Sequence, residues 1–128
     1  MTVDNIHPSH YISNSIIVEP IDLFPFFKSG CVSIFFKYVV RYKDKGKPYE
    51  DLKKACYYYD YMISYNDYPD PNCKSLLILY CLKSNNDLLR VPNIWDLTVP
   101  GILSGIYENV CDKIEFLENL HESGKNCC

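Results

Sequence analysis

The sequence lacks the short motifs that mark the commonest phosphate and metal sites. It contains no GxxxxGK[ST] and no GxGxxG, which excludes a P-loop and a Rossmann-type phosphate site. It contains no CxxC pair, which excludes a zinc ribbon and a thioredoxin-type centre. No pattern for Ser/His/Asp or Cys/His catalysis is recognisable either. Any chemistry must therefore come from residues that the fold brings together.

Targeting signals and long apolar runs are also missing. The first residues, MTVDNIHPSHYISNS, have neither a basic start nor an apolar core, so we expect no signal peptide. The longest apolar stretch, CVSIFF followed by KYVV, is far shorter than the roughly 20 residues of a membrane span. The seven cysteines are an odd number without a secretion signal, which favours free thiols in a reducing cytosol. We expect a cytoplasmic protein that does not enter a membrane.

The composition is that of one ordinary globular domain spanning residues 1–128. Hydrophobic residues make up 48% and charged residues 23% of the chain, which excludes wholesale disorder. The net charge of −3 excludes general nucleic-acid binding. Charge is distributed unevenly, because residues 7–63 hold eight basic and six acidic side chains, whereas residues 64–128 hold five and nine. The cations suited to a site therefore lie in the first half, and residues 64–128 are predicted to be a helical extension.

Hydrophobic spacing predicts a mostly α-helical fold of about four helices after an irregular N-terminal arm. Residues 31–42 read as a buried helix, with a strand pair as the alternative, and SIIV at 15–18 is strand-like. Further helices are expected over 48–65, 73–83 and from about 98–100 to 121, with Trp95 filling the core and Gly46 in a turn. The predicted buried face of 48–65 consists of Leu52, Cys56, Tyr59 and Ile63, supplemented by Ala55 and Met62. That of the last helix consists of Ile102, Ile106, Val110, Ile114 and Leu117.

The first candidate site group is HPSHY at residues 7–11. Its two imidazoles, His7 and His10, and the ring of Tyr11 are suited to binding a phosphate, stacking on a base or holding a metal. The alternative is a surface segment with incidental histidines.

Lys37 and Arg41 form the second group, inside the most apolar segment. On a helix their i, i+4 spacing puts both cations on one face, where they are suited to phosphate contact. The alternative is a pair of side chains that reach solvent at the helix edge, or that pair with Glu19 or Asp22.

Two further groups carry charge. Glu19 and Asp22 are spaced to share a Mg²⁺ ion, or else to complement the N-terminus of a helix that starts at Pro20. The lysines around Gly46 would close over phosphates, or else form a solvated turn; they are Lys43, Lys45 and Lys47.

Taken together, four motifs resemble a family catalogued as DUF3310, also called SaV-like and found mainly in bacteriophages. The motifs are HPSHY at 7–11, EPID at 19–22, FKYVVRY at 36–42 and EDLKKACYY at 50–58. The likeness covers about residues 7–63. Within the acidic motif EPID, Pro20 departs from the family pattern. The matching positions are His7, His10, Tyr11, Lys37, Tyr38, Arg41, Asp51, Leu52, Lys54, Ala55 and Tyr58.

The resemblance implies either of two functions. The family includes the nucleotide kinase of T7-type phages, which phosphorylates deoxynucleoside monophosphates without a P-loop. It also includes a lactococcal phage protein that engages a host abortive-infection system. The first implies a nucleoside monophosphate kinase that uses Mg²⁺, and the second a non-catalytic interaction protein that antagonises or triggers a host defence protein in the host cytoplasm.

These inferences give an expected site and three hypotheses. The N-terminal arm is expected to fold back so that its histidines meet Lys37 and Arg41, in a pocket sized for a mononucleotide. In the kinase hypothesis the catalytic residues are His10, Arg41 and Asp51. The nucleotide is bound by His7, Tyr11, Lys37, Lys45 and Lys54, and Mg²⁺ is held by Glu19 and Asp22. The other hypotheses are the interaction protein and a structural homodimer whose polar motif only holds the arm; a homo-oligomer is expected.

Overall fold

The computed structural model describes residues 18–27, 30–44 and 46–126, with side chains described as far as Leu120. This part of the chain contains helices and no strand. The helices are α1 (Pro20–Leu23), α2 (Gly30–Arg41), α3 (Pro48–Ser64), α4 (Lys74–Lys83) and α5 (Val99–Asn126). Four single 3₁₀ turns, η2 (Phe24–Phe26), η3 (Pro71–Cys73), η4 (Asp87–Leu89) and η5 (Ile94–Asp96), lie between them. No helix in the described ranges is both long and apolar enough to cross a bilayer.

Helices α2 and α3 form an antiparallel pair joined by the turn at 42–47. Gly46 has a φ of +72°, a left-handed conformation that glycine adopts without strain, so the chain reverses here. Pro48 then occupies the first turn of α3, where its missing N–H costs nothing. Phe35 packs on Tyr59 with ring centroids 5.2 Å apart, which holds the two helices in register.

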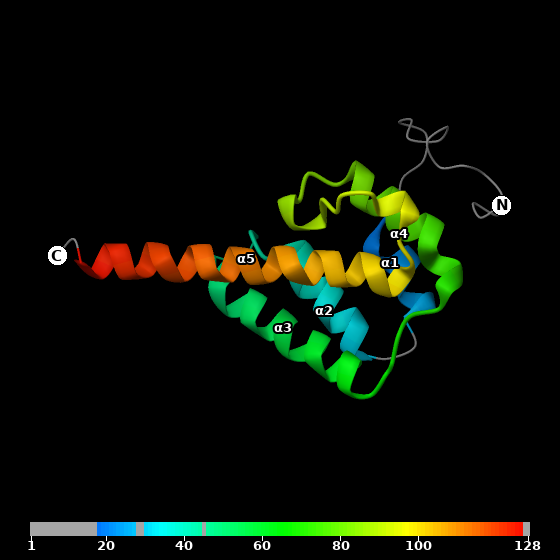
Figure 1. Cartoon of the computed structure of the whole chain (residues 1–128), viewed down its shortest axis with the longest axis horizontal. Helices are drawn as coiled ribbons and strands as arrows, with labels where there is room; N and C mark the ends of the chain where they lie inside the picture. Colours follow the sequence, from blue (N-terminus) through cyan, green and yellow to red (C-terminus); the bar gives the residue numbers. More distant parts are fainter. Residues whose placement is uncertain (1–17, 28–29, 45, 127–128) are drawn as a thin grey trace.

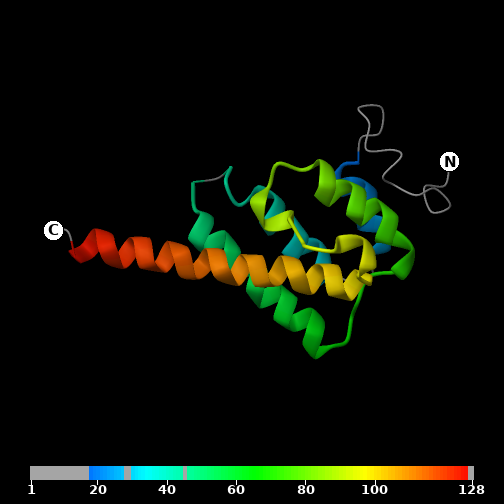
Figure 2. The same ribbon diagram turned by 45° about the horizontal axis from the view of Figure 1, so that its top comes forward.

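Helix α5 lies antiparallel to α3 and runs the length of the molecule (Figure 1). Its 28 residues extend about 42 Å, and its C-terminal end projects beyond the other helices in both ribbon views (Figure 2). Tyr107 of α5 stacks on Tyr59 with ring centroids 4.2 Å apart and ring planes 15° apart. Near the start of α5, a Cβ added at Gly105 would lie 2.6 Å from Val91, so the connector before α5 passes too close for a larger residue.

Two asparagines fasten the connector between α4 and α5. The Asn86 Nδ2 donates to the Val39 carbonyl of α2 at 2.9 Å, while its Oδ1 caps η4. From the other side, the Asn109 Nδ2 of α5 donates to the carbonyls of Leu88 and Arg90, both at 2.9 Å. These bonds satisfy backbone groups that a loop would otherwise leave unpaired.

The predicted helical fold is confirmed, with α1 as an additional single turn and α5 longer than expected. In α5, Ile102, Ile106 and Val110 are buried as predicted, whereas Ile114 and Leu117 are half-buried. In α3 the prediction was partly wrong, because the side chain of Ile63 is 44% exposed and Cys56 is half-buried. Ala55 and Met62, which were predicted to supplement this face, are fully buried. The buried face is rotated toward them because α3 packs against both α2 and α5. Trp95 is half-buried and packs against the core from outside. The strand-like residues 15–17 lie outside the described residues, and Val18 has no regular structure.

Asp87 in η4 joins three parts of the chain that are distant in sequence. Its Oδ1 accepts the Tyr42 hydroxyl at 2.5 Å and lies 3.3 Å from the Lys43 ammonium, and its Oδ2 lies 3.0 Å from the Lys113 ammonium of α5. Burial of Asp87 disfavours its charge, but the hydrogen bonds from Tyr42, Lys113 and Lys43 outweigh that effect and hold the pKa of the carboxyl well below its usual range. Burial, together with the bond to Asp87, also raises the pKa of Tyr42.

We predict that Asp87→Asn destabilises the fold by about 1 kcal/mol at neutral pH, a value reduced for the partial exposure of the carboxylate. Because the pKa of Asp87 is lower in the folded protein than in the unfolded chain, this stabilisation is complete above pH of about 4 and is lost as the pH falls. Urea unfolding at pH 7 and pH 3 measures it. The difference between the wild type and Asp87→Asn should shrink at pH 3, whereas Asp112→Asn, an exposed carboxylate change on α5, should have little effect at either pH. Equal destabilisation at both pH values would contradict this account.

Candidate functional site

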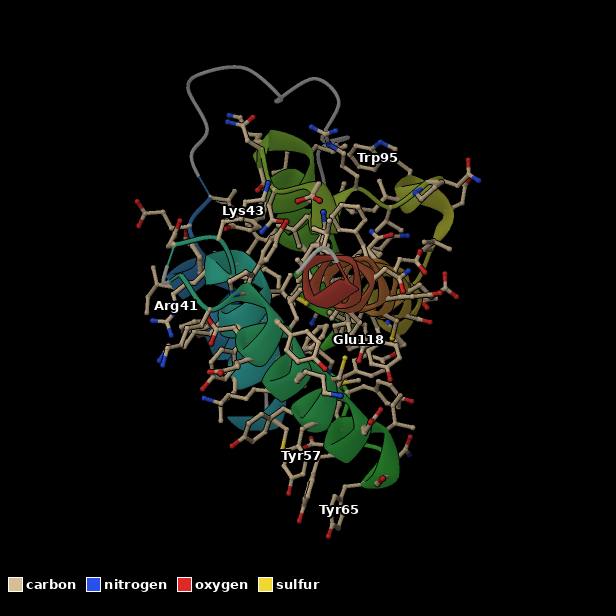
Figure 3. All side chains as sticks on the ribbon, turned by 90° about the vertical axis from the view of Figure 1, so that its left-hand side faces the viewer. Arg41, Lys43, Tyr57, Tyr65, Trp95 and Glu118 are labelled. Carbon is tan, nitrogen blue, oxygen red and sulfur yellow. The ribbon has the colours of Figure 1, made fainter. Side chains whose placement is uncertain are left out.

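The candidate site lies along one edge of the α2–α3 pair. We call Lys37, Arg41 and Lys54 the cationic edge. Arg41 ends α2, and the helical i, i+4 spacing puts it on the same face as Lys37, as the sequence predicted. In Figure 3, which shows side chains as sticks, Arg41 lies at the margin of the bundle away from α5.

Arg41 carries an unsatisfied polar atom. Its Nε is buried and has no hydrogen-bond partner within the residues that the structure describes. An unpaired buried N–H costs about 1–3 kcal/mol relative to a paired one. Such a group is uncommon in a folded protein, and it is suited to donate to an incoming oxygen atom.

The register of the helix pair places two more side chains beside Arg41. The Lys54 ammonium lies over the Tyr38 ring, 5.8 Å from its centroid, so position 54 of α3 stands opposite position 38 of α2. One turn further along each antiparallel helix, Asp51 of α3 comes opposite Arg41 of α2. Asp51 is 9% exposed, the one buried charged residue of the described part. The two residues therefore share the end of the pair, although no ion pair within 4.0 Å joins them.

The other predicted cations differ in their surroundings. Lys37 and Lys47 are exposed. Lys43 is engaged by Asp87 and lies over the Tyr42 ring, 5.6 Å from its centroid, so it does not turn toward Arg41. Lys45 and the arm residues His7, His10 and Tyr11 lie outside the described residues, and their meeting with the cationic edge stays a prediction.

Glu19 and Asp22 cap α1, which is the alternative that the sequence left open for them. The Glu19 backbone N–H donates to the Asp22 Oδ2 at 2.9 Å, and the Glu19 side chain accepts from the α1 backbone in return. No group of three or more His, Cys, Asp or Glu side chains occurs in the described ranges, so no third ligand joins this pair. Helix α1 packs on α4, so the two carboxylates stand on a different element from the cationic edge. A role in holding Mg²⁺ stays a prediction.

Two surface hollows lie elsewhere on the molecule. One, of about 490 Å³, lies between the end of α4 and the connector and includes Arg90 and Pro92. The other, of about 280 Å³, lies beside Asp87 and is lined by Lys113 and Phe116 of α5. Sequence reasoning missed the Asp87 cluster because no local pattern links residues 42, 87 and 113.

The comparisons with known proteins bear on the first half of the chain. Residues 6–60 match the model of a family described as a protein of unknown function, DUF3310. This segment, which we call the DUF3310 segment, is therefore similar to that family, and the match ends before the second half of the chain. No curated protein and no solved structure matches the chain.

The DUF3310 segment contains the whole cationic edge but not the whole core. It runs from the arm through α1 and α2 and ends inside α3 at residue 60. The core that covers its apolar side chains includes Leu77 and Ile78 of α4 and Ile102 and Ile106 of α5. The second half of the chain therefore supplies the support on which the cationic edge is built.

We predict that Arg41→Met leaves the melting temperature unchanged or raises it by a few degrees when no ligand is present. Methionine keeps an unbranched apolar stem and removes the buried N–H that has no partner. Thermal unfolding followed by circular dichroism measures the change. A clear fall in the melting temperature would instead assign Arg41 a structural role in holding the N-terminal arm.

Proposed function

We propose that the cationic edge binds the phosphate of a nucleotide. The observation that carries this proposal is the buried, unpartnered Nε of Arg41. A guanidinium donates two parallel hydrogen bonds to a phosphate, and Nε is one of the donors it uses for that geometry. Lys37 supplies a second charge from the same face of α2, and Lys54 supplies one from α3.

The reaction best suited to this site is transfer of a phosphoryl group to a nucleoside monophosphate. Such transfer depends mainly on positioning and on stabilising charge at the phosphate oxygens, so it needs no covalent intermediate on the protein. Arg41 would neutralise the transferred group, with Asp51 orienting it from the first turn of α3. His10 of the arm is the predicted proton carrier, and His7, Tyr11 and Lys45 are the predicted nucleotide contacts. Magnesium bound through the nucleotide phosphates would neutralise further charge, with Glu19 and Asp22 as its predicted protein ligands.

Thermal shift in reducing buffer tests the nucleotide site. Deoxynucleoside mono-, di- and triphosphates are added with and without Mg²⁺, and the melting temperature is measured against concentration. We expect a saturable rise of several degrees for at least one nucleotide, because a ligand that binds only the folded state stabilises it. Arg41→Met should abolish the rise.

Arg90→Met is the matched control, since Arg90 is the second arginine of the chain and lies exposed next to η4. It should retain the full shift. The absence of any shift with the wild type, or an equal shift in Arg41→Met, would refute the phosphate site. A saturable shift without product formation in a turnover assay would leave nucleotide binding and remove the kinase activity.

A second candidate function, that of a non-catalytic interaction protein, is favoured by a set of exposed rings on α3. We call Tyr57, Tyr61 and Tyr65 the tyrosine row. They recur at i+4 spacing, and their side chains are 59%, 42% and 68% exposed. Adjacent ring centroids are 5.7 Å and 5.0 Å apart, so the rings form one continuous ridge (Figure 3).

The partner that fits this ridge most directly is a second copy of the chain. Rows of side chains at i+4 spacing pack into the grooves between identical rows on another helix. Lys53 lies one helical turn before Tyr57 on the same face of α3. If a second α3 packs antiparallel with the two Tyr57 side chains at the centre, Lys53 of one copy lies over the Tyr61 ring of the other. Tyrosine is enriched at the energetic centres of interfaces, whereas isolated exposed rings give little affinity.

We predict that the wild type self-associates and that the double variant Tyr57→Ser, Tyr65→Ser does not. Light scattering after size-exclusion chromatography, over a range of concentrations and with reductant, gives the molar mass. The control is Phe116→Ser, which removes a ring of similar exposure, 55%, from α5 and should associate like the wild type. A wild type that stays monomeric at every concentration would refute self-association through α3.

A further inference from the structure

The seam between α3 and α5 has a fixed register. At one end the Tyr49 hydroxyl donates to the Glu118 Oε2 at 2.9 Å. At the other end the Tyr107 hydroxyl donates to the Asp60 Oδ1 at 3.2 Å. The two helices are antiparallel, so each step forward along α3 corresponds to a step backward along α5 (Figure 1).

This register brings two cysteines face to face. Cys56 lies two turns after Tyr49 and Cys111 lies two turns before Glu118, so the pair falls within the seam. The same pair lies one turn away from the Asp60–Tyr107 contact in each helix. The two side chains are close enough for Cys111 to raise the pKa of the Cys56 thiol, and both cysteines are free thiols.

The two thiols differ in access. Cys111 is exposed on α5, whereas Cys56 is half-buried behind it. Burial, together with the hydrogen bond and charge of Cys111, raises the pKa of the Cys56 thiol to about 12. An incoming reagent therefore meets the Cys111 sulfur first, and Cys56 is placed to react with whatever forms there.

We propose that Cys56 and Cys111 form a dithiol site that small disulfides, such as oxidised glutathione, convert into an intramolecular disulfide between α3 and α5. Facing positions on closely packed antiparallel helices supply the opposed Cβ atoms that a disulfide requires. Cys111 contributes to the raised pKa of Cys56, whereas no second sulfur is among the causes that raise the pKa of Cys73 and Cys81.

The reaction balances as two thiol–disulfide exchanges. The Cys111 thiolate attacks one sulfur of oxidised glutathione, the Cys111 Sγ–S bond forms, the glutathione S–S bond breaks and one glutathione thiolate leaves. Cys56, after losing its proton, then attacks the Cys111 Sγ and releases the second glutathione thiolate. Both thiolates take up a proton, so two cysteine thiols are oxidised and one glutathione disulfide is reduced to two thiols.

The disulfide would join α3 to α5 without reaching the cationic edge. Lys54 faces α2 across Tyr38, whereas Cys56 faces α5, so the two lie on different sides of α3. Closing the chain between residues 56 and 111 restricts the unfolded state, and we expect the melting temperature to rise by about 10 °C. Any nucleotide-dependent shift should be the same in the oxidised and reduced protein.

The test is to incubate the reduced full-length protein with oxidised glutathione, alkylate the remaining thiols in acid, and digest without reductant. Mass spectrometry should find the tryptic peptide 55–74 joined to peptide 91–113, and the link should disappear after reduction. Because Cys73 shares the first peptide, Cys56→Ser must abolish the link for it to be assigned to Cys56. Cys111→Ser must abolish it as well.

Cys31→Ser is the matched control, since Cys31 is a half-buried cysteine on α2, and this variant should form the link like the wild type. The proposal is overturned if the 55–74 and 91–113 link is absent while Cys111 accumulates as its mixed disulfide with glutathione. It is also overturned if the link survives in Cys56→Ser, or if the linked protein melts at a lower temperature than the reduced one.

Discussion

The packing of one ring, that of Tyr59, fixes the geometry on which the other features depend. It touches Phe35 of α2 on one side and stacks on Tyr107 of α5 on the other. Because aromatic rings prefer defined offsets and angles, this contact sets the register of α3 against both neighbours at once. One edge of α3 places Lys54 and Asp51 beside α2, and the opposite edge places Cys56 beside Cys111. The tyrosine row lies next to Lys54 on the first of these edges and extends toward solvent.

The two polar centres of the molecule have contrasting energetics. At Asp87, two lysines and a tyrosine hydroxyl satisfy one carboxylate, and this cluster ties the 42–44 turn, η4 and α5 together. At Arg41 a buried donor is left without a partner. Satisfied polar clusters stabilise a fold, whereas an unsatisfied donor is tolerated where a ligand completes it. The proposed phosphate site at Arg41 rests on this contrast, whereas the Asp87 cluster supports the fold.

The basic first half and the acidic second half of the chain have different roles in the structure. The DUF3310 segment contains the cationic edge, and the acidic second half contains the helices that cover the apolar side of that segment. The exposed acids of α5, such as Glu108 and Glu115, lie on its wet face, as expected for a supporting helix. The long α5 also contains Cys111 and Lys113, so one helix contributes to both the Cys56–Cys111 pair and the Asp87 cluster.

The sequence by itself determined the helices, most of their buried faces and the placement of Lys37 and Arg41 on one face of α2. These features depend on residues only a few positions apart in the chain, through the helical period and the turn residues. The sequence also determined that Gly46 ends a turn, since a left-handed residue there follows from local chemistry. It could not determine that Ile63 is exposed, because that depends on how α3 rotates between two partners. Nor could it pair Tyr42 with Asp87, or Cys56 with Cys111, since these residues are brought together only when the three helices pack in one register.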